Sequence, residues 1–528
     1  MFLPVPPSSP LLELDAVVIG SGFGGAMAAW ELVAAGLRVA MVERGGWVER
    51  GPQNWAGEGA FVRTPAYARD SAFRVLQGRR WAEQNLCTCV GGPSVYYGGS
   101  SFRFRQRDFD PAPEIVGDSG AAWPFAYDAL EPFYTQAERL LGVAGAAGTD
   151  PTEPPRSAPY PYPPSPLAAP SRRIEAAARS LGLHPFPIPL AINYAAETGC
   201  RRCTTCDAFA CAIGAKNDIA TRMIPELVMR GMQLFTDTLA VRLVAEGDRI
   251  AAVECRNRTT GEPLVLRAES FVVAAGALAT PHLLLASGLE RMNPAGQAVG
   301  RYLMRHCNAM TYGIFPRNPN PGNEHHKQLA IHDFYFGVDE KDAPCGKLGN
   351  MQQVMGPPAA MLEVGLPRPI ARMATPLVEH MTGLLSIAED QPRAENGVRI
   401  DAAAIDRFGL PRMSVTSLYS PRDLTARAAL VRRAKKILRR AGAWGTATWK
   451  VSTFSHAVGT VRMGDDERTA PLDPDCRFRG LENLYVTDGS CFPTSAGVNP
   501  SLTIAANALR VGRRMAAHAS PAHAEAAG

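Results

Sequence analysis

The chain has 528 residues, of which 46% are hydrophobic and 20% are charged, and its formal net charge at pH 7 is +5. This composition is typical of a globular protein and excludes a disordered or fibrous one. The positive excess is too dilute to indicate a nucleic-acid partner, and we interpret the basic run at residues 432–440 as a solvated helix face. A chain of this length forms about three domains, or fewer and larger interleaved ones.

The apolar runs and the cysteines predict a location. Residues 1–10 lack the basic region, apolar stretch and cleavage site of a signal peptide, which predicts a cytoplasmic protein. The most apolar run, residues 271–285, contains glycine, threonine, proline and histidine, so we expect no transmembrane segment. In a reducing compartment the eleven cysteines are expected to remain thiols or metal ligands rather than disulfides.

The first motif lies at residues 15–43. An apolar strand leads into a Gly-x-Gly-x-x-Gly turn, a helix is predicted at 26–35, and a second strand at 38–43 ends in an acid. Such glycines let the backbone approach a pyrophosphate, the helix N–H groups face its charge, and the acid can bind an adenosine ribose. The pattern predicts a dinucleotide site, for FAD or NAD, formed by Gly20, Gly22, Phe23, Gly24, Gly25 and Glu43.

Three further motifs narrow the choice of cofactor. A glycine- and serine-rich loop at 90–101 is long enough to surround the middle of a cofactor, although a flexible surface loop is the alternative. Segments 274–288 and 299–306 follow, and a C-terminal block runs from His456 to Asn499. In this order the motifs resemble those of the glucose-methanol-choline (GMC) oxidoreductase family, and most of all a bacterial, cysteine-rich branch of it.

The resemblance implies an α/β fold in which a Rossmann-like FAD-binding domain is interleaved with a substrate domain built on a mainly antiparallel sheet covered by helices. The FAD-binding domain is expected at 11–110, 190–306 and 453–518, and the substrate domain at 111–189 and 307–452. The segment 151–170 contains nine prolines and is expected to be an extended connection. Residues 519–528 are expected to form a flexible tail.

The family's cofactor contacts can be carried over onto matching positions. They are Gly91, Gly92, Ser94, Gly98, Gly99, the backbone near Val241, Ala275, Gly276, Asp488, Gly489, Asn499 and Pro500. For Asp488 a turn-forming role is the alternative. Tyr97 stands where the family commonly has asparagine, which puts that flavin contact in doubt, and the loop has no histidine for covalent attachment. We therefore expect noncovalent FAD.

Two residues of the C-terminal block are the predicted catalytic pair. Oxidation of an alcohol needs a base within reach of the hydroxyl proton, and a neutral imidazole can act as that base. His456 matches the family's active-site histidine. Asn499 matches its second member, a histidine in other branches, and its carboxamide can orient a hydroxyl; it is also well placed as a helix N-cap before Pro500. The following helix would direct its positive end toward the flavin.

The four cysteines Cys200, Cys203, Cys206 and Cys211 form an unusual cluster. Thiolates at Cys-x-x-Cys spacing can bind zinc or an iron–sulfur cluster. The alternative is a tightly packed loop whose thiols are free, or form a disulfide only on oxidation. The sequence leaves these alternatives open. Cys87 and Cys89 are interpreted as residues buried beside the 90–101 loop.

Other polar residues are interpreted as structural. His306, His326, His332 and His380 are expected in the core or on the surface, and Glu389 with Asp390 at a solvated strand end. Strands are predicted at 381–388, at 398–400 and within 232–255, where a turn at Gly247 joins two of them, and helices at 123–141 and 424–440.

The function predicted from these motifs is FAD-dependent oxidation of an alcohol, of a sugar or sterol for example, to a carbonyl. A proton is abstracted, a hydride passes to flavin N5, and the electrons go to an external acceptor other than NAD. The alternatives are a flavin-dependent lyase or photoenzyme on the same fold, and an electron-transfer module with a cysteine-ligated cluster. The sequence does not determine the alcohol, the acceptor, oxidase against dehydrogenase activity, or the oligomeric state.

Overall fold

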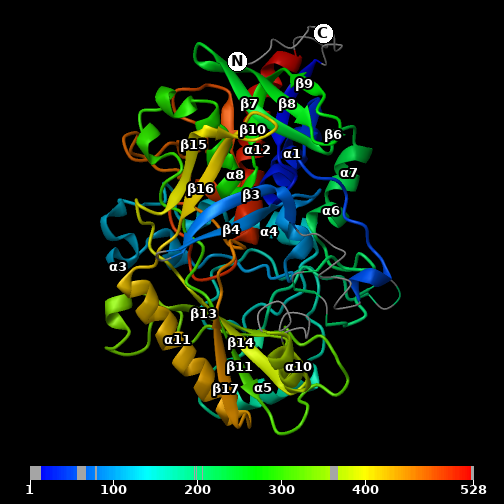
Figure 1. Cartoon of the computed structure of the whole chain (residues 1–528), viewed down its shortest axis with the longest axis vertical. Helices are drawn as coiled ribbons and strands as arrows, with labels where there is room; N and C mark the ends of the chain where they lie inside the picture. The colour runs from blue at the N-terminus through cyan, green and yellow to red at the C-terminus, as the bar shows by residue number, and fades with distance from the viewer. Residues whose placement is uncertain are drawn as a thin grey trace.

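A five-stranded parallel sheet lies at one end of the molecule and a six-stranded antiparallel sheet at the other (Figure 1). The computed structural model describes residues 13–55, 67–77, 80–195, 197, 199–204, 206–207, 209–356 and 367–524. None of the helices in these ranges combines the length and the apolar character needed to cross a membrane.

The parallel sheet has the strand order β18-β10-β1-β2-β6. Its strands come from the beginning, the middle and the end of the chain: β1 (Leu14–Ile19), β2 (Val39–Val42), β6 (Gln233–Phe235), β10 (Ala268–Val273) and β18 (Leu484–Val486). All neighbouring pairs are parallel. The strands β1 and β2 are buried along their whole length, because helices and loops cover both faces of a parallel sheet.

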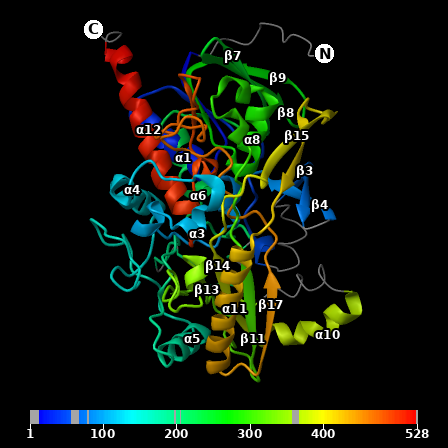
Figure 2. The same ribbon diagram turned by 90° about the vertical axis from the view of Figure 1, so that its left-hand side faces the viewer.

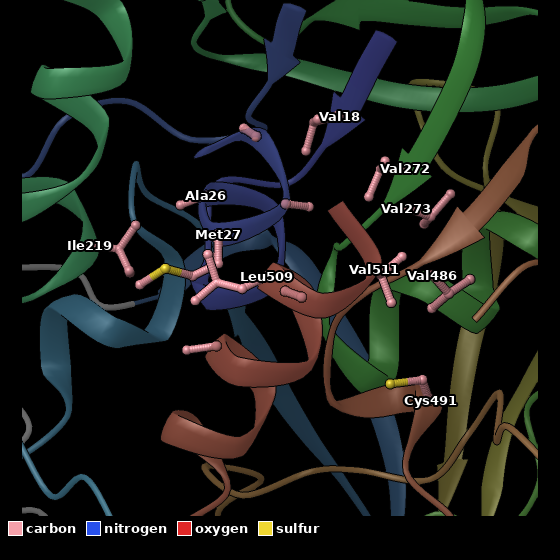
Figure 3. Close-up of a cluster of buried hydrophobic side chains, with 14 of the residues drawn as sticks. Val18, Ala26, Met27, Ile219, Val272, Val273, Val486, Cys491, Leu509 and Val511 are labelled. Atoms are coloured by element: carbon pink, nitrogen blue, oxygen red, sulfur yellow. The ribbon is translucent and has the colours of Figure 1, made fainter. Parts of the chain in front are cut away.

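The helices α1 (Phe23–Ala34) and α12 (Ser501–Ala524) pack against each other beside this sheet. A Cβ at Gly512 would lie 2.8 Å from the carbonyl oxygen of Ala28, so glycine permits the close approach. Figure 3 shows the shared core, in which Val18, Met27, Val272 and Leu509 belong to β1, α1, β10 and α12. The helix α12 continues to Ala524, so residues 519–524, expected in a flexible tail, are helical instead; residues 525–528 lie outside the described ranges.

The antiparallel sheet has the strand order β17-β11-β14-β13-β12-β5. Its strands are β5 (Phe186–Pro187), β11 (Ala309–Ile314), β12 (Leu329–Ile331), β13 (Gly349–Val354), β14 (Met381–Ala388) and β17 (Gly445–Lys450). The long helix α11 (Pro421–Arg440) runs beside these strands in Figure 2, and its apolar face packs with Met351 and Leu384. Ser420 and Asp423 form a capping box at its N-terminus, which explains why the helix begins there.

Two smaller sheets complete the architecture. One joins β3 (Tyr67–Gln77) and β4 (Arg80–Cys87) to β15 (Gly397–Ile405) and β16 (Pro411–Thr416). The other consists of β7 (Thr238–Glu246), β8 (Arg249–Asn257) and β9 (Pro263–Leu266). The predicted turn at Gly247 between β7 and β8 is confirmed, with φ at +60°.

The remaining helical elements are short. The predicted helix at 123–141 is a 3-10 turn (Tyr127–Ala129) followed by α4 (Glu131–Leu141), which packs against α12. The proline-rich segment has no helix or strand until α5 (Ala169–Arg179) begins. The other helices are α3 (Pro113–Val116), α6 (Ile219–Arg222), α7 (Ile224–Met229), α8 (Gly276–Ala286) and α10 (Arg368–Val378). Further 3-10 turns are η1 (Pro52–Asn54), η2 (Gly92–Tyr96), η3 (Gln106–Phe109), η4 (Gly117–Ser119), η6 (Leu289–Met292), η7 (Gly296–Ala298), η8 (Ala343–Cys345) and η9 (Gly489–Cys491).

Candidate active site

The glycines after β1 have two different roles. A Cβ added at Gly20 would lie 2.4 Å from the carbonyl oxygen of Ala274, and a Cβ added at Gly25 would lie 1.9 Å from the carbonyl oxygen of Gly20. These glycines therefore allow the backbone to pack tightly. Gly22 differs, because a Cβ there would meet no atom within 4 Å. Gly22 is also the N-cap of α1 and supplies no side-chain cap, so open space faces the helix N-terminus, which fits a cofactor phosphate.

Glu43 is buried at the end of β2 and faces the same turn. Its carboxylate accepts hydrogen bonds from the Ser21 amide at 3.1 Å, the Ser21 hydroxyl at 2.6 Å and the Gly45 amide at 2.9 Å. Burial raises the pKa of Glu43 above its ordinary value, although these hydrogen bonds oppose the shift. The carboxylate is thus fixed at the glycine turn, where the sequence predicts a ribose contact.

The 90–101 loop is folded onto this turn. The Gly91 amide donates to the Ser21 hydroxyl at 2.9 Å, and a Cβ at Gly92 would lie 3.6 Å from the Gly22 Cα. The Ser94 hydroxyl donates to the Gly91 carbonyl at 2.6 Å and accepts from the Ile219 amide at 3.1 Å. The alternative of a flexible surface loop is therefore wrong for these residues, which are mostly buried.

The other end of the loop also has defined neighbours. The Gly99 carbonyl accepts from the Ala191 amide at 2.7 Å, and Gly98 lies against the ion pair of Asp207 and Lys327. Tyr97 packs its ring against Phe23 with centroids 5.4 Å apart. Its hydroxyl donates to the Asn217 carbonyl at 3.1 Å, so this departure from the family pattern has a structural use.

Asp488 connects the turn η9, of which it is the N-cap, to the first turns of α8. Its carboxylate accepts from the Gly276 amide at 2.8 Å, the Thr280 hydroxyl at 2.5 Å and the Ser490 amide at 2.7 Å. The turn-forming alternative thus has direct support, and a cofactor contact stays a prediction. Gly276 has φ at +88° and open space at its Cβ position, beside Ala275, the N-cap of α8. Of the remaining predicted contacts, Gly489 is buried at the start of η9, and Val241 is buried in β7.

The structure brings the predicted catalytic pair together. Asn499 Nδ2 lies 3.1 Å from His456 Nε2. The other ring nitrogen of His456, Nδ1, lies 3.0 Å from Nδ1 of His306, which is 1% exposed. Burial lowers the pKa of His456 well below its ordinary value, and the nearby His306 and Lys327 lower it further. His456 is therefore a neutral imidazole at neutral pH.

The segment before α12 is held by the antiparallel sheet. Gln352 on β13 donates to the Oδ1 atom of Asn499, and Asn350 on the same strand donates to the Gly497 carbonyl at 2.6 Å. The Gly497 amide donates to the Tyr335 hydroxyl at 2.8 Å. At the helix itself, the Ser501 hydroxyl donates to the Ser100 carbonyl at 3.0 Å, which fixes the start of α12 beside the 90–101 loop.

Several residues of this site were assigned differently from the sequence. His306 was expected to be a core or surface residue, but it contacts the predicted base. Glu389 and Asp390 were expected at a solvated strand end, but they are 0% and 3% exposed. They follow β14 into the interior, where Glu389 forms an ion pair with Lys347, and Asp390 accepts from the Ser495 hydroxyl. Of these, His306 has a signal in the sequence, since it ends the 299–306 motif.

The cysteine cluster lies in a loop near the 90–101 segment. Cys206 is buried, which raises its pKa, while Cys200, Cys203 and Cys211 are half-buried. Within the described ranges, no group of three or more His, Cys, Asp or Glu side chains is arranged to hold a metal ion. The structure therefore gives no support to either metal alternative for these thiols. Cys89 is buried beside Gly92, as predicted. Cys87 is half-buried, and its sulfur lies 3.9 Å from the sulfur of Cys89.

Comparisons with known proteins agree with the motifs. The family models described as GMC oxidoreductase match residues 162–308 and 392–508, and an FAD binding domain model matches residues 15–72. A 6'''-hydroxyparomomycin C oxidase from Streptomyces lividus is 34% identical, over 96% of this chain and 91% of the relative. A paromamine 6'-oxidase from Streptomyces fradiae is 32% identical, over 95% of this chain and 91% of the relative.

The solved structures give the same fold. The crystal structure of pyridoxine 4-oxidase from Mesorbium loti has a TM-score of 0.67 at 18% identity, and the match covers 95% of this chain and 99% of that one. At this identity the likeness shows the fold alone, which is the interleaved α/β fold predicted from the motifs. From its sequence matches and its fold, the chain belongs to the GMC oxidoreductase family and is an FAD-dependent oxidoreductase that acts on alcohol groups.

Proposed function

We propose that the protein oxidises a hydroxyl group of an amino-sugar compound to a carbonyl, with His456 as the base. The observation that carries the proposal is the pair of His456 Nε2 and Asn499 Nδ2, 3.1 Å apart at the start of α12. A substrate hydroxyl that binds beside both atoms and replaces the hydrogen bond between them gives its proton to the imidazole and accepts a hydrogen bond from the carboxamide. FAD, when bound, supplies the acceptor of the hydride.

The residues that hold FAD follow from the fit of the site. The open N-terminus of α1 at Gly22 accommodates the pyrophosphate, and Glu43 binds the adenosine ribose. The buried 90–101 loop and the start of α12 at Pro500 would surround the flavin when it is bound, and the positive end of the helix would stabilise its reduced form. The loop has no histidine, so FAD is bound noncovalently. Acid precipitation should therefore release the flavin into the supernatant.

The substrate class is argued from the relatives and from one aromatic pair. The two relatives are named for oxidations at hydroxyparomomycin and at paromamine, which are amino-sugar compounds. Tyr312 on β11 and Trp449 on β17 pack with ring centroids 5.3 Å apart, and Trp449 is 42% exposed. An exposed aromatic face attracts an ammonium group or the apolar face of a sugar. We infer that this pair contacts the substrate, and Trp449→Ala should raise KM more than it lowers kcat.

The division of labour along the chain is part of the proposal. Segments 11–110, 190–306 and 453–518 bind FAD, and segments 111–189 and 307–452 bind the substrate. The electrons leave to an acceptor other than NAD. We also propose a cytoplasmic location. The reducing conditions there would keep the eleven cysteines as the free thiols that the structure has.

The test is anaerobic reduction of the bound flavin. The flavin of the purified holoenzyme should bleach with amino-sugar alcohols and not with sterols, while His456→Ala should bind flavin and bleach on the order of 10²–10⁴ times more slowly. His380→Ala is the matched control, because that imidazole forms a hydrogen bond with the backbone carbonyl of Phe315 and does not belong to the predicted pair. Bleaching by His456→Ala at the rate of the parent enzyme would remove His456 as the base, and a flavin that bleaches with no alcohol would overturn the proposal.

A further inference from the structure

His306 is a buried histidine whose two ring nitrogens face different kinds of partner. Its Nε2 lies 3.0 Å from the carbonyl oxygens of both Ser495 and Ala496. A carbonyl oxygen only accepts hydrogen bonds, so this Nε2 must carry a hydrogen. Burial lowers the pKa of His306 below its ordinary value, and the ring is therefore neutral with a single N–H. Its Nδ1 consequently carries a lone pair.

The lone pair of His306 determines the tautomer of its neighbour. The two Nδ1 atoms lie 3.0 Å apart with the ring planes at 80°, and one of them must donate. Since His306 Nδ1 can only accept, His456 Nδ1 carries the hydrogen. His456 Nε2 is then left with the lone pair, and it accepts from Asn499 Nδ2. The hydrogen bonds of all three side chains agree with this single arrangement.

From this arrangement we propose that His306 is a positioning residue, which holds His456 in the tautomer whose Nε2 lone pair faces Asn499 and the substrate hydroxyl. The inference rests on the proposed role of His456 as the base. When His456 takes a proton at Nε2, the ring becomes a cation and its Nδ1–H bond to His306 becomes charge-assisted and stronger. His306 thus acts through His456.

The backbone of His306 is fixed as firmly as its ring. Its φ is +63°, a left-handed conformation that is strained for a side chain with a Cβ. The carboxylate of Asp390 accepts from the amides of Arg305 at 2.9 Å and His306 at 3.0 Å. On the other side, the Tyr419 hydroxyl donates to the His306 carbonyl at 2.8 Å. These bonds hold the strained turn and prevent the imidazole from leaving its neighbour.

The charges that face His306 come from several elements. Glu389 after β14 raises its pKa and Lys347 before β13 lowers it, and these two groups form an ion pair with each other. Asp390 binds the backbone and the Ser495 hydroxyl rather than the ring. The neutral state of His306 therefore depends mainly on burial.

Two substitutions distinguish positioning from packing. In His306→Asn the Oδ1 atom can occupy the place of Nδ1 and accept from His456, whereas His306→Leu removes the acceptor and keeps an apolar volume. For His306→Leu we expect flavin reduction per bound FAD to slow on the order of 10²–10³-fold with little change in KM, because the base is free to adopt the wrong tautomer. His306→Asn should recover most of the rate, and His380→Leu should match the parent enzyme.

A second measurement reads the tautomer directly. In protein labelled with ¹⁵N-histidine, the signals lost in His456→Ala identify His456 among the ten histidines. The parent protein should show His456 protonated at Nδ1, and His306→Leu should show the other tautomer or a mixture. This readout does not depend on turnover.

The outcomes separate the inference from the proposed function. If His456→Ala keeps the parent rate, there is no base to position and both fail. If His456→Ala loses the rate while His306→Leu keeps it per bound FAD, with His456 still protonated at Nδ1, only the role of His306 is overturned. If His306→Leu and His306→Asn lose flavin equally and keep the same rate per FAD, His306 serves packing alone and the inference is likewise overturned.

Discussion

The amide nitrogen of Asn499 lies 3.1 Å from Nε2 of His456, and its amide oxygen accepts a hydrogen bond from Gln352. Gln352 thus fixes the orientation of the carboxamide, with the NH₂ group toward the imidazole. The two residues of the pair come from different parts of the C-terminal block, and strand β13 of the antiparallel sheet holds Asn499 through Gln352. The amide nitrogen of Asn499 is thus available as a donor at the imidazole, and the amide oxygen is occupied by Gln352.

Replacement of Asn499 should affect the chemical step. Asn499→Ala removes the donor that faces the substrate oxygen, and the rate of flavin reduction should fall on the order of 10²–10³-fold. Asn499→His replaces it with the residue found at this position in other family branches and should retain more activity. Anaerobic stopped-flow reduction measures both variants, with the flavin content as the control for folding. Equal rates in Asn499→Ala and the parent enzyme would exclude a role in catalysis.

Alanine at two glycines of the first turn should affect different properties, stability at Gly25 and FAD binding at Gly22. In Gly25→Ala the new Cβ would overlap the Gly20 carbonyl oxygen at 1.9 Å, so the free energy of unfolding should fall by about 2 kcal/mol or more. In Gly22→Ala the Cβ enters open space, so the apoprotein should fold normally but bind FAD weakly. Thermal unfolding of the apoproteins and the flavin-to-protein ratio are the measurements. Full FAD occupancy in Gly22→Ala would contradict the predicted pyrophosphate contact.

The activity should persist at mildly acidic pH. Because the pKa of His456 is lowered, the base stays unprotonated below its ordinary pKa of about 6.5, and the acidic limb of kcat/KM should lie below that pH. Lys327 contributes to this shift and forms an ion pair with Asp207, 2.7 Å away. Lys327→Met removes the cation and leaves the carboxylate, so the limb should move to higher pH. A limb that does not move would show that Lys327 does not act on His456.

Stability should depend on pH through His325. This histidine is 2% exposed, and burial lowers its pKa to about 4, so the folded protein binds no proton there between pH 6.5 and about 4. The unfolded chain does bind one, and the free energy of unfolding therefore falls as the pH decreases through this window, by about 3 kcal/mol in total. His325→Gln, which does not titrate, should have a flatter dependence. Urea unfolding at a series of pH values checks the slope, and parallel curves would contradict the assignment.

Arg103 should contribute strongly to the stability of the folded protein. Its guanidinium is 1% exposed and forms a bidentate ion pair with Glu138, at 2.9 and 2.8 Å. Arg103→Met leaves the buried Oε1 atom of Glu138 without this donor, while Arg156 still binds Oε2, and the free energy of unfolding should fall by about 3 kcal/mol. Arg103→Lys should recover only part of this, because an ammonium group cannot form both parallel bonds. Urea unfolding compares them, and a lysine variant as stable as the parent would show that the fork geometry is unimportant.

Local patterns in the sequence determined much of the fold and predicted part of the candidate site. The motif at residues 15–43 is local, because the glycine turn, its flanking strands and Glu43 lie within about 30 residues of each other. The residue types in such a segment are enough to specify its backbone geometry. The same holds for β14, the β7–β8 turn and the helix after Pro500. The motif order was enough to identify the family and its cofactor and to predict the pair His456 and Asn499. The 90–101 loop was recognised, although its composition did not distinguish a folded segment from a mobile one.

The tertiary structure determines which side chains orient His456 and Asn499. His306 and His456 are 150 positions apart in the chain, and Gln352 and Asn499 are 147 apart. No local pattern records such contacts, because they depend on how the antiparallel sheet packs against the start of α12. The burial of Glu389 and Asp390 also depends on tertiary packing. Their position after a strand predicts solvent exposure, but the packing buries them, and ion pairs and backbone amides compensate their charge. The sequence therefore predicted the base, and only the fold indicates which of its two nitrogens carries the lone pair.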